Sequence, residues 1–217
     1  MEMGSRTAAL GKDVNTMFNY EKRLQFPINI KEPNARLAQF IISQYGGPDG
    51  ELGASMRYLS QRYSIPYREV AGLLTDLGVE ELSHFEMIGT IVHQLTKDLP
   101  MEEIEKSGFG PYYIDHTLAL WPQAAGGIPF NACEFQSKGD IITDLVEDMA
   151  AEQKARTTYD NILRTIKDPD VAEPIRFLRA REIVHFQRFG EALRLVQDKL
   201  DSKNFYAFNP EFDTCKD

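Results

Sequence analysis

Apolar residues recur at intervals of three and four along four long segments of the chain. This spacing places them on one face of an α-helix. The first segment spans about residues 33–63, with an interruption at 46–50, and the second spans about 66–97. The third follows a loop at 137–139 and continues to about 166, and the fourth spans about 168–200. No segment has the alternation of a β-strand, so the pattern predicts an all-α protein.

The connection between the second and third helices is unusually long. Residues 98–136 are rich in glycine, proline and aromatic residues, and they are too many for a hairpin turn. The segment must therefore cross the bundle or cover one of its ends, as the long crossover of a ferritin-like four-helix bundle does. We expect residues 1–17 to be a flexible N-terminal extension, residues 18–200 to form the helical domain, and residues 201–217 to form a C-terminal tail.

The apolar faces of the second and fourth helices are each interrupted at the centre by a Glu-x-x-His pair. In the second helix the pair is Glu81 and His84, and in the fourth it is Glu182 and His185. The second face consists of Leu74, Leu77, Glu81, His84, Ile88, Ile91 and Leu95. The fourth consists of Val171, Ile175, Leu178, Glu182, His185, Phe189, Ala192 and Val196. The chain has four histidines, and two of them occupy this motif.

The first and third helices each carry one carboxylate on their inward face. The first face consists of Leu37, Phe40, Gln44, Gly47, Glu51, Ala54 and Tyr58. The third consists of Ile142, Leu145, Met149, Glu152, Arg156, Tyr159 and Leu163. The order along the chain is therefore Glu, Glu-x-x-His, Glu, Glu-x-x-His.

That order is the donor set of a dinuclear carboxylate site in a helical bundle. A single inward Glu or His is more often a satisfied polar group of the core, but several carboxylates converging without cations would each cost several kcal/mol. Two divalent ions would balance four glutamates. Oxygen and imidazole donors suit manganese or iron. His93 and His116 lack such a motif, so we expect surface or loop-packing roles for them.

Composition narrows the possible partners and location. The formal net charge of −9 disfavours nucleic acid and anionic membrane surfaces as partners. No apolar run approaches the roughly 20 residues that span a bilayer, and the N-terminus lacks the apolar region of a secretory signal. Cys133 and Cys215 do not form a CxxC motif. A cytoplasmic location is therefore expected.

Four sequence blocks together resemble the manganese catalase family, in particular its short, spore-coat catalase-like branch. They are FNYEKRLQ at 18–25, GGPDGE at 46–51, EELSHFEMI at 80–88 and AREIVH at 180–185. The resemblance covers about residues 17–200. It implies dismutation of hydrogen peroxide to water and dioxygen through a two-electron cycle of two manganese ions per chain. It also implies a homo-oligomer, a hexamer by family pattern, with spore-coat proteins as possible partners and the spore coat as a possible location.

The resemblance also implies roles for individual residues. Glu51, Glu81 and His84 correspond to ligands of one manganese ion, with Glu81 as the expected bridge. Glu152 and His185 correspond to ligands of the other.

Two further residues correspond to partners of the ligands. Glu182 would be an outer-sphere carboxylate that moves protons, and Tyr58, seven residues after Glu51, would donate a hydrogen bond to a ligand carboxylate. Ala151 stands where some members carry a basic residue near the metal entrance. Two alternative functions use the same motifs: a di-iron oxidase, ferroxidase or peroxidase, and a mainly structural spore-coat protein with a metal site.

Overall fold

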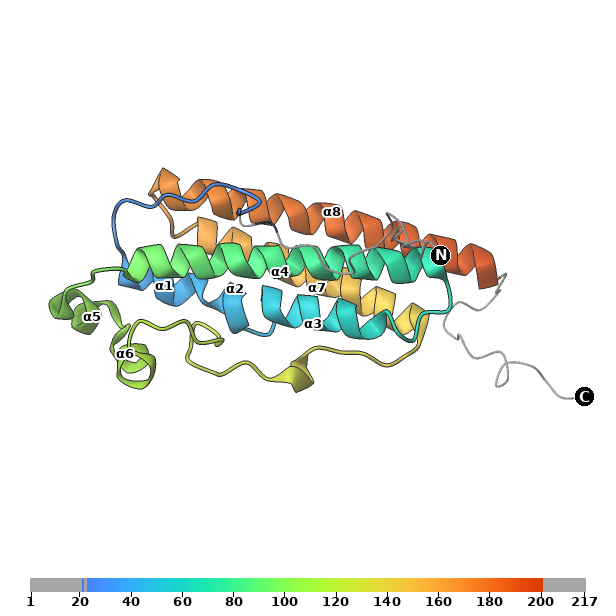
Figure 1. The fold of residues 1–217 in the computed structure, drawn as a ribbon, viewed down its shortest axis with the longest axis horizontal. Coiled ribbons are helices and arrows are strands. Elements are labelled where there is room, and N and C mark those ends of the chain that lie inside the picture. The colour runs from blue at the N-terminus through green and yellow to red at the C-terminus, as the bar shows by residue number, and fades with distance from the viewer. Residues whose placement is uncertain (1–20, 22, 201–217) are drawn as a thin grey trace, which may run out of the picture.

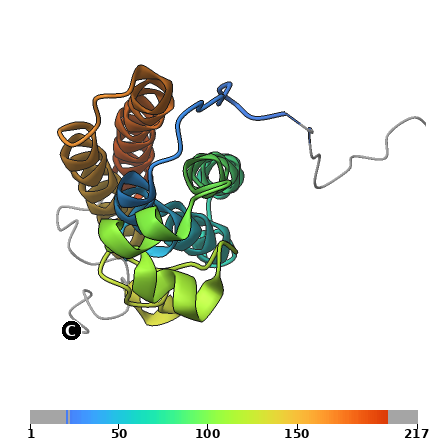
Figure 2. The same ribbon diagram turned by 90° about the vertical axis from the view of Figure 1, so that its left-hand side faces the viewer.

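A computed structural model of the chain describes residue 21 and residues 23–200. The predicted extension at 1–17 and the tail at 201–217 lie outside these residues. The described residues form helices and one isolated β-bridge, between Gln123 and Pro129, but no β-strand. Four roughly parallel rods form a bundle (Figures 1 and 2). The predicted all-α, ferritin-like fold is confirmed.

The first rod is broken into three helices: α1 (Ala35–Ile41), α2 (Ser43–Gly46) and α3 (Glu51–Gln61). The break falls at the predicted interruption, where the chain packs closely against the crossover. A Cβ atom on Gly46 would lie 2.3 Å from the backbone carbon of Pro122, so a larger residue would push the crossover away. Gly46 therefore allows the chain to pack closely against the crossover at this break.

The other rods are single long helices: α4 (Arg68–Thr96), α7 (Ile141–Leu163) and α8 (Pro169–Leu200). The helices α3 and α4 pack as one pair, and α7 and α8 pack as the other. Asn34 caps α1 by accepting a hydrogen bond from the Leu37 amide, and Asp140 caps α7 by accepting one from the Thr143 amide. Side-chain caps of this kind fix the residue at which each helix begins.

The crossover between α4 and α7 contains three short helices that periodicity did not predict. They are α5 (Met101–Ser107), α6 (Gly110–His116) and the 3₁₀ turn η1 (Ala132–Glu134). Figure 1 shows the crossover leaving the α1 end of the bundle and running back beside α3 to the start of α7. The ring of His116 stacks on Trp121 with centroids 4.7 Å apart, which agrees with the expected loop-packing role. His93 is exposed.

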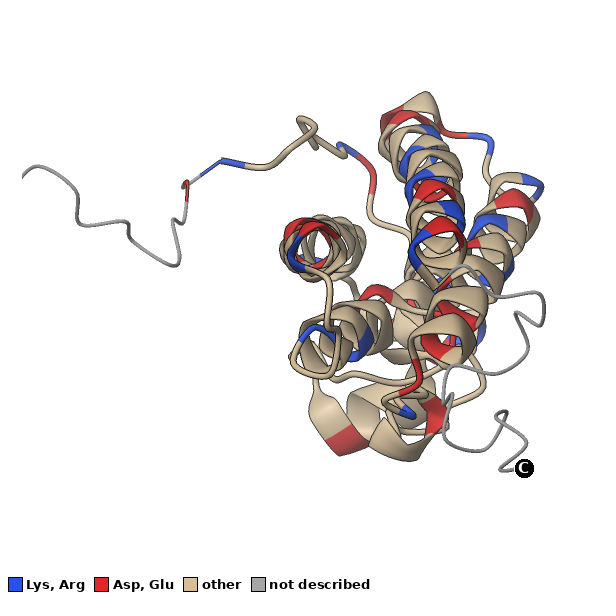
Figure 3. Cartoon of the chain, turned by 90° about the vertical axis from the view of Figure 1, so that its right-hand side faces the viewer, with Lys and Arg blue, Asp and Glu red and all other residues tan. Residues whose placement is uncertain are grey.

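Two hydrophobic clusters fill the two ends of the bundle. One contains Ile41, Ile88 and Ile91 with the N-terminal half of α8, and the other contains Leu74, Leu77 and Phe189 with the N-terminal end of α7. The polar positions of α4 and α8 lie between these clusters. On the outside, acidic and basic residues are interspersed along the α7–α8 side (Figure 3). Among the described helices, none combines the length and apolar character needed to cross a membrane.

The buried face of α7 differs in part from the predicted one. Met149, Arg156 and Leu163 are only half-buried, whereas Asp148, Ala155 and Ile162 are buried. The guanidinium of Arg156 bonds outside the core, where Nη1 donates to Asp160 Oδ2 at 2.7 Å. The prediction for Arg156 was wrong because the spacing of apolar residues does not show where a charged side chain can find a partner.

Candidate metal centre

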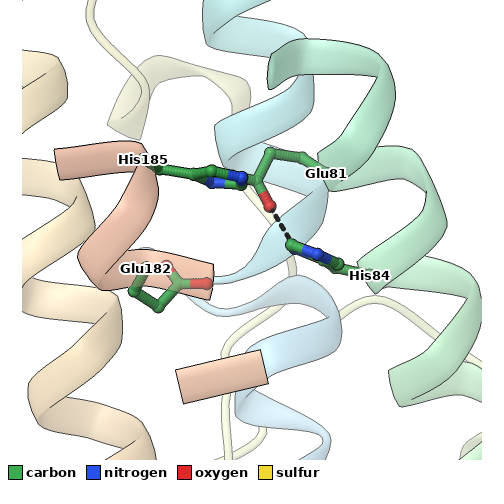
Figure 4. Close-up of side chains that lie close together, drawn as sticks. All are labelled: Glu81, His84, Glu182 and His185. Atoms are coloured by element: carbon green, nitrogen blue, oxygen red, sulfur yellow. Dashed lines mark hydrogen bonds and ion pairs between the residues drawn. The ribbon is translucent and has the colours of Figure 1, made fainter. Parts of the chain in front are cut away.

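Two Glu-x-x-His pairs face one another at the middle of the bundle. Glu81 and His84 project from α4, and Glu182 and His185 project from α8 (Figure 4). Residues three apart lie on the same face of a helix, so each pair presents both side chains inward. All four are buried, and one donor atom from each lies within 4.8 Å of the others. The structure therefore brings together both pairs that the sequence singled out.

Glu81 lies between the two imidazole rings. Its Oε2 is 2.8 Å from Nδ1 of His84, and its Oε1 is 2.6 Å from Nδ1 of His185. The rings themselves are nearly parallel, with centroids 5.5 Å apart. One carboxylate thus faces both histidines through different oxygens, which is the arrangement that a bridging ligand requires.

The two remaining glutamates complete the cluster from α3 and α7. Glu51 Oε2 is 3.8 Å from Nδ1 of His84, and Glu152 Oε2 is 3.6 Å from Nδ1 of His185. Both glutamates are buried. The structure therefore places Glu51, Glu81 and Glu152 near the Nδ1 atoms of the two histidines, and Glu182 belongs to the same buried group.

Two tyrosines hold the glutamates of the opposite helix. The hydroxyl of Tyr58 on α3 donates to Glu152 Oε1 on α7, and the hydroxyl of Tyr159 on α7 donates to Glu51 Oε1 on α3. The family resemblance implied this role for Tyr58, which follows Glu51 by seven residues. Tyr159 follows Glu152 by the same seven, and this repeated spacing is the signal in the sequence that points to Tyr159.

Sequence analysis also missed Glu80, which lies on the outer side of both histidines. Its carboxylate oxygens are 3.7 Å from Nε2 of His84 and 3.2 Å from Nε2 of His185. Arg181 Nε donates to Glu80 Oε1 at 2.8 Å, and Gln25 Nε2 donates to the same oxygen at 3.0 Å. The sequence contains one signal for this pair, since Glu80 and Arg181 immediately precede the two motif glutamates, Glu81 and Glu182.

The charged groups of the cluster strongly shift one another's pKa values. Burial, together with neighbouring carboxylates, raises the pKa of Glu51 and of Glu182 well above the usual range. Burial would lower the pKa of His84, but the facing carboxylate of Glu81 and the carboxylate of Glu80 raise it to about 9. The charges of both histidines in turn hold the pKa of Glu81 below its usual value despite burial. Without a metal, the cluster compensates its negative charge by binding protons.

Several buried oxygens of the cluster lack a hydrogen-bond donor among the described residues. They include Oε2 of Glu152 and Oε1 of Glu182. Unpaired buried acceptors are costly and rare, and cations would satisfy them. Carboxylate oxygens together with imidazole nitrogens are donors that manganese accepts. The residues present therefore fit a manganese centre.

Comparison with known proteins also indicates a manganese centre. The family model described as manganese containing catalase matches residues 17–209. The chain belongs to this family. It is 50% identical to Protein CotJC of Bacillus subtilis (strain 168) over 190 residues, which cover 88% of this chain and 100% of that protein.

Two further relatives carry the catalase name. A probable manganese catalase of Clostridium acetobutylicum is 32% identical, with 87% of this chain and 85% of that protein covered. The crystal structure of wild-type KatB, a manganese catalase from Anabaena, is similar in fold. Its TM-score is 0.77 at 30% identity, with 83% of this chain and 81% of that chain covered. The predicted family, its branch, the manganese catalase class and the metal are confirmed by these comparisons.

Proposed function

We propose that this chain dismutates hydrogen peroxide to water and dioxygen at two manganese ions held between α3, α4, α7 and α8. The observation that carries the proposal is the convergence of six buried carboxylate and imidazole side chains on one point of the bundle. Two manganese ions bound there would supply a redox couple that takes two electrons from one peroxide and returns them to another.

In this proposal each ion has its own histidine and glutamate, and Glu81 is shared. His84 with Glu51 would hold one ion, and His185 with Glu152 would hold the other. The contact of each Glu81 oxygen with a different histidine supports the shared role. Four glutamates in the centre would balance two divalent cations, which removes the cost of burying like charges together.

The position of Glu80 supports ligation through Nδ1 of both histidines. A histidine that binds metal through one nitrogen usually donates its other N–H to a carboxylate or carbonyl, which fixes the tautomer and the ring orientation. Both Nε2 atoms face the Glu80 carboxylate, and Arg181 and Gln25 hold that carboxylate in place. Glu80 would therefore keep both Nδ1 atoms free of protons and directed at the metals.

Glu182 is proposed as the acid and base of the reaction. Its carboxyl is buried beside the other donors, its Oε1 is unpaired, and its pKa is raised well above the usual range by burial. A buried carboxyl beside the donors can give a proton to a peroxide oxygen within hydrogen-bond reach and take one back.

Iron would bind the same donors, and the family match is what favours manganese over the alternative di-iron oxidase. A hexameric assembly, spore-coat protein partners and a location in the spore coat stay predictions, and the 50% identity to Protein CotJC supports the location alone. A mainly structural role would leave the buried, unpaired oxygens of Glu152 and Glu182 without a chemical purpose.

The deciding experiment measures dioxygen release from hydrogen peroxide together with metal content. We expect about two manganese ions per chain and vigorous release by the wild type. The Glu152→Ala variant should lose activity by more than the roughly 100-fold that removal of an outer partner costs. The matched control is Glu102→Ala, because Glu102 is exposed and pairs with Lys106 on the surface. Dioxygen consumption with a reductant, or bound metal without turnover, would overturn the proposal.

A further inference from the structure

An irregular segment ahead of α1, residues 24–30, lies over the histidine side of the candidate centre. We call it the strap. Figure 2 shows it running between α4 and α8 on its way to α1. On the α8 side, the ring of Phe26 packs on that of Phe177 with centroids 5.1 Å apart. On the α4 side, Gln94 Nε2 donates to the carbonyl oxygen of Ile28 at 3.2 Å. The strap therefore joins α4 and α8 without belonging to either helix.

The strap also holds the carboxylate of Glu80. Gln25 Nε2 donates to Glu80 Oε1 at 3.0 Å, and Ser83 Oγ donates to Gln25 Oε1 at 3.3 Å. Nε2 of His84 is buried and points at Glu80, but at 3.7 Å it is too far for a hydrogen bond, and it has no hydrogen-bond partner among the described residues. The position of Glu80 thus depends on the strap more than on His84.

An acidic groove connects Glu80 with the outside of the bundle. It lies between the beginning of the strap and α4, and its volume is about 850 Å³. Its lining includes the carboxylates of Glu21, Asp76, Glu80 and Glu86. Arg23 in the same lining pairs with Glu21 at 2.7 Å. A hollow lined by carboxylates concentrates cations, so the groove leads them toward Glu80.

The other approach to the centre, a passage beside α3, is too narrow for a hydrated metal ion. Its lining includes exposed Pro48 and buried Glu51, Arg57 and Glu152, so it reaches the glutamate side. Its volume is about 10 Å³, roughly the space that one water molecule needs. Manganese prefers about six oxygen ligands, so the ion in water carries a shell of that many water molecules. Arg57 also adds a positive charge to this lining. These features favour a different entrance for manganese.

We propose that manganese enters the centre on the histidine side, from the groove beside the strap, and that Glu80 is the first carboxylate of the centre to bind the incoming ion. Lifting the strap releases Glu80 from Gln25 and leaves Arg181 as its partner. A divalent ion replaces Arg181 because it carries twice the charge. The strap contains no helix or strand, so it opens at lower cost than a rod of the bundle. The inference rests on the proposed manganese centre, but it does not depend on turnover.

The test is the rate at which the metal-free protein takes up manganese, followed by the loss of the electron paramagnetic resonance signal of the ion in water. A second measurement follows the release of bound manganese to excess chelator. Gln25→Ala and Phe26→Ala each loosen the strap, and each should raise the uptake rate about tenfold. Release should accelerate by about the same factor, because a cover changes the barrier between the free and bound states and not the states themselves.

Two control variants separate the strap from general loosening and from the passage beside α3. Leu118→Ala is matched to Phe26→Ala, because Leu118 is a half-buried residue packed on the same hydrophobic cluster but lies in the crossover. Its uptake and release rates should equal those of the wild type. Ala151→Val narrows the passage beside α3, which Ala151 lines, and should leave uptake unchanged.

Unchanged uptake in both strap variants, or uptake slowed by Ala151→Val, would overturn the proposed route. Faster release without faster uptake would also overturn it, since the strap would then only orient Glu80. If Phe26→Ala does not fold, Gln25→Ala decides, because Gln25 is exposed. A wild type that binds no manganese would overturn the proposed function together with the route, whereas equal rates in protein that binds manganese would overturn the route alone.

Discussion

The two sides of the candidate centre are held in different ways. On the histidine side, one carboxylate, Glu80, faces both imidazoles and is tied to Arg181 across α4 and α8. On the glutamate side, two phenol hydroxyls reach across between α3 and α7, Tyr58 to Glu152 and Tyr159 to Glu51. A charged carboxylate thus orients the histidines, whereas neutral hydroxyl donors orient the glutamates.

Burial explains this difference. The side chains of Glu80 and Arg181 are 18% and 27% exposed, so water solvates part of the ion pair and lowers its cost. Tyr58 and Tyr159 are fully buried, and burial raises the pKa of both phenols well above the usual range, so they remain neutral donors. Charged groups can orient ligands at the edge of a bundle, whereas neutral groups do so in its core at lower cost.

The largest effect on manganese binding is expected from a change at Glu80. Glu80→Gln should lower manganese affinity about 10- to 100-fold, because it removes the negative charge that faces Nε2 of both histidines and pairs with Arg181. The measurement is manganese titration of the metal-free protein against a competing chelator. Glu102→Gln, which changes an exposed glutamate paired with Lys106, is the control. Unchanged affinity would mean that the histidines are oriented without Glu80.

The tyrosines should affect the stability of the metal-free protein more than its metal affinity. Tyr58→Phe or Tyr159→Phe leaves a buried carboxylate oxygen without a donor, which costs about 1–3 kcal/mol, or roughly 2–12 °C in Tm. Thermal unfolding of the metal-free variants tests this. The control is Tyr63→Phe, since Tyr63 is 81% exposed. A fall in Tm no larger than that of the control would show that the two tyrosine–glutamate hydrogen bonds do not stabilise the metal-free protein.

The smallest expected effect is a pH dependence of the metal-free protein. The folded pKa of His84 is about 9, above its ordinary unfolded value of about 6.5, so its stabilising contribution is complete below 6.5 and is lost as pH rises through 9. The raised pKa of Glu182 acts in the same direction, because the folded state binds the extra proton. The Tm of the metal-free protein should therefore fall between pH 6 and pH 9.

Manganese should reverse this dependence, since metal ions compete with protons for the same donors and bind more tightly as pH rises. Parallel melts with and without manganese at three pH values between about 6 and 9 provide the check. A Tm of the metal-free protein that rises with pH would contradict the proposed protonation of His84 and Glu182.

Sequence reasoning located the donors because their positions obey helical geometry. Glu81 and His84 stand on an apolar face, and that face is buried whatever the detailed packing. The same reasoning misplaced Arg156 and overlooked Asp148 on α7. Helix α7 has little difference between its faces in hydrophobic content, so the periodic signal was weak there and neighbouring helices decided which residues became buried.

The sequence by itself determined the four helical rods, the interruption in the first of them, the long crossover and the Glu, Glu-x-x-His, Glu, Glu-x-x-His order, because these depend on the local pattern of residues along the chain. Tertiary structure alone decided which glutamate each tyrosine holds, that Glu80 serves both histidines, and that Arg57 lies in the passage beside Glu51. Those contacts join residues far apart in the chain, and their partners are set by how the helices pack against one another.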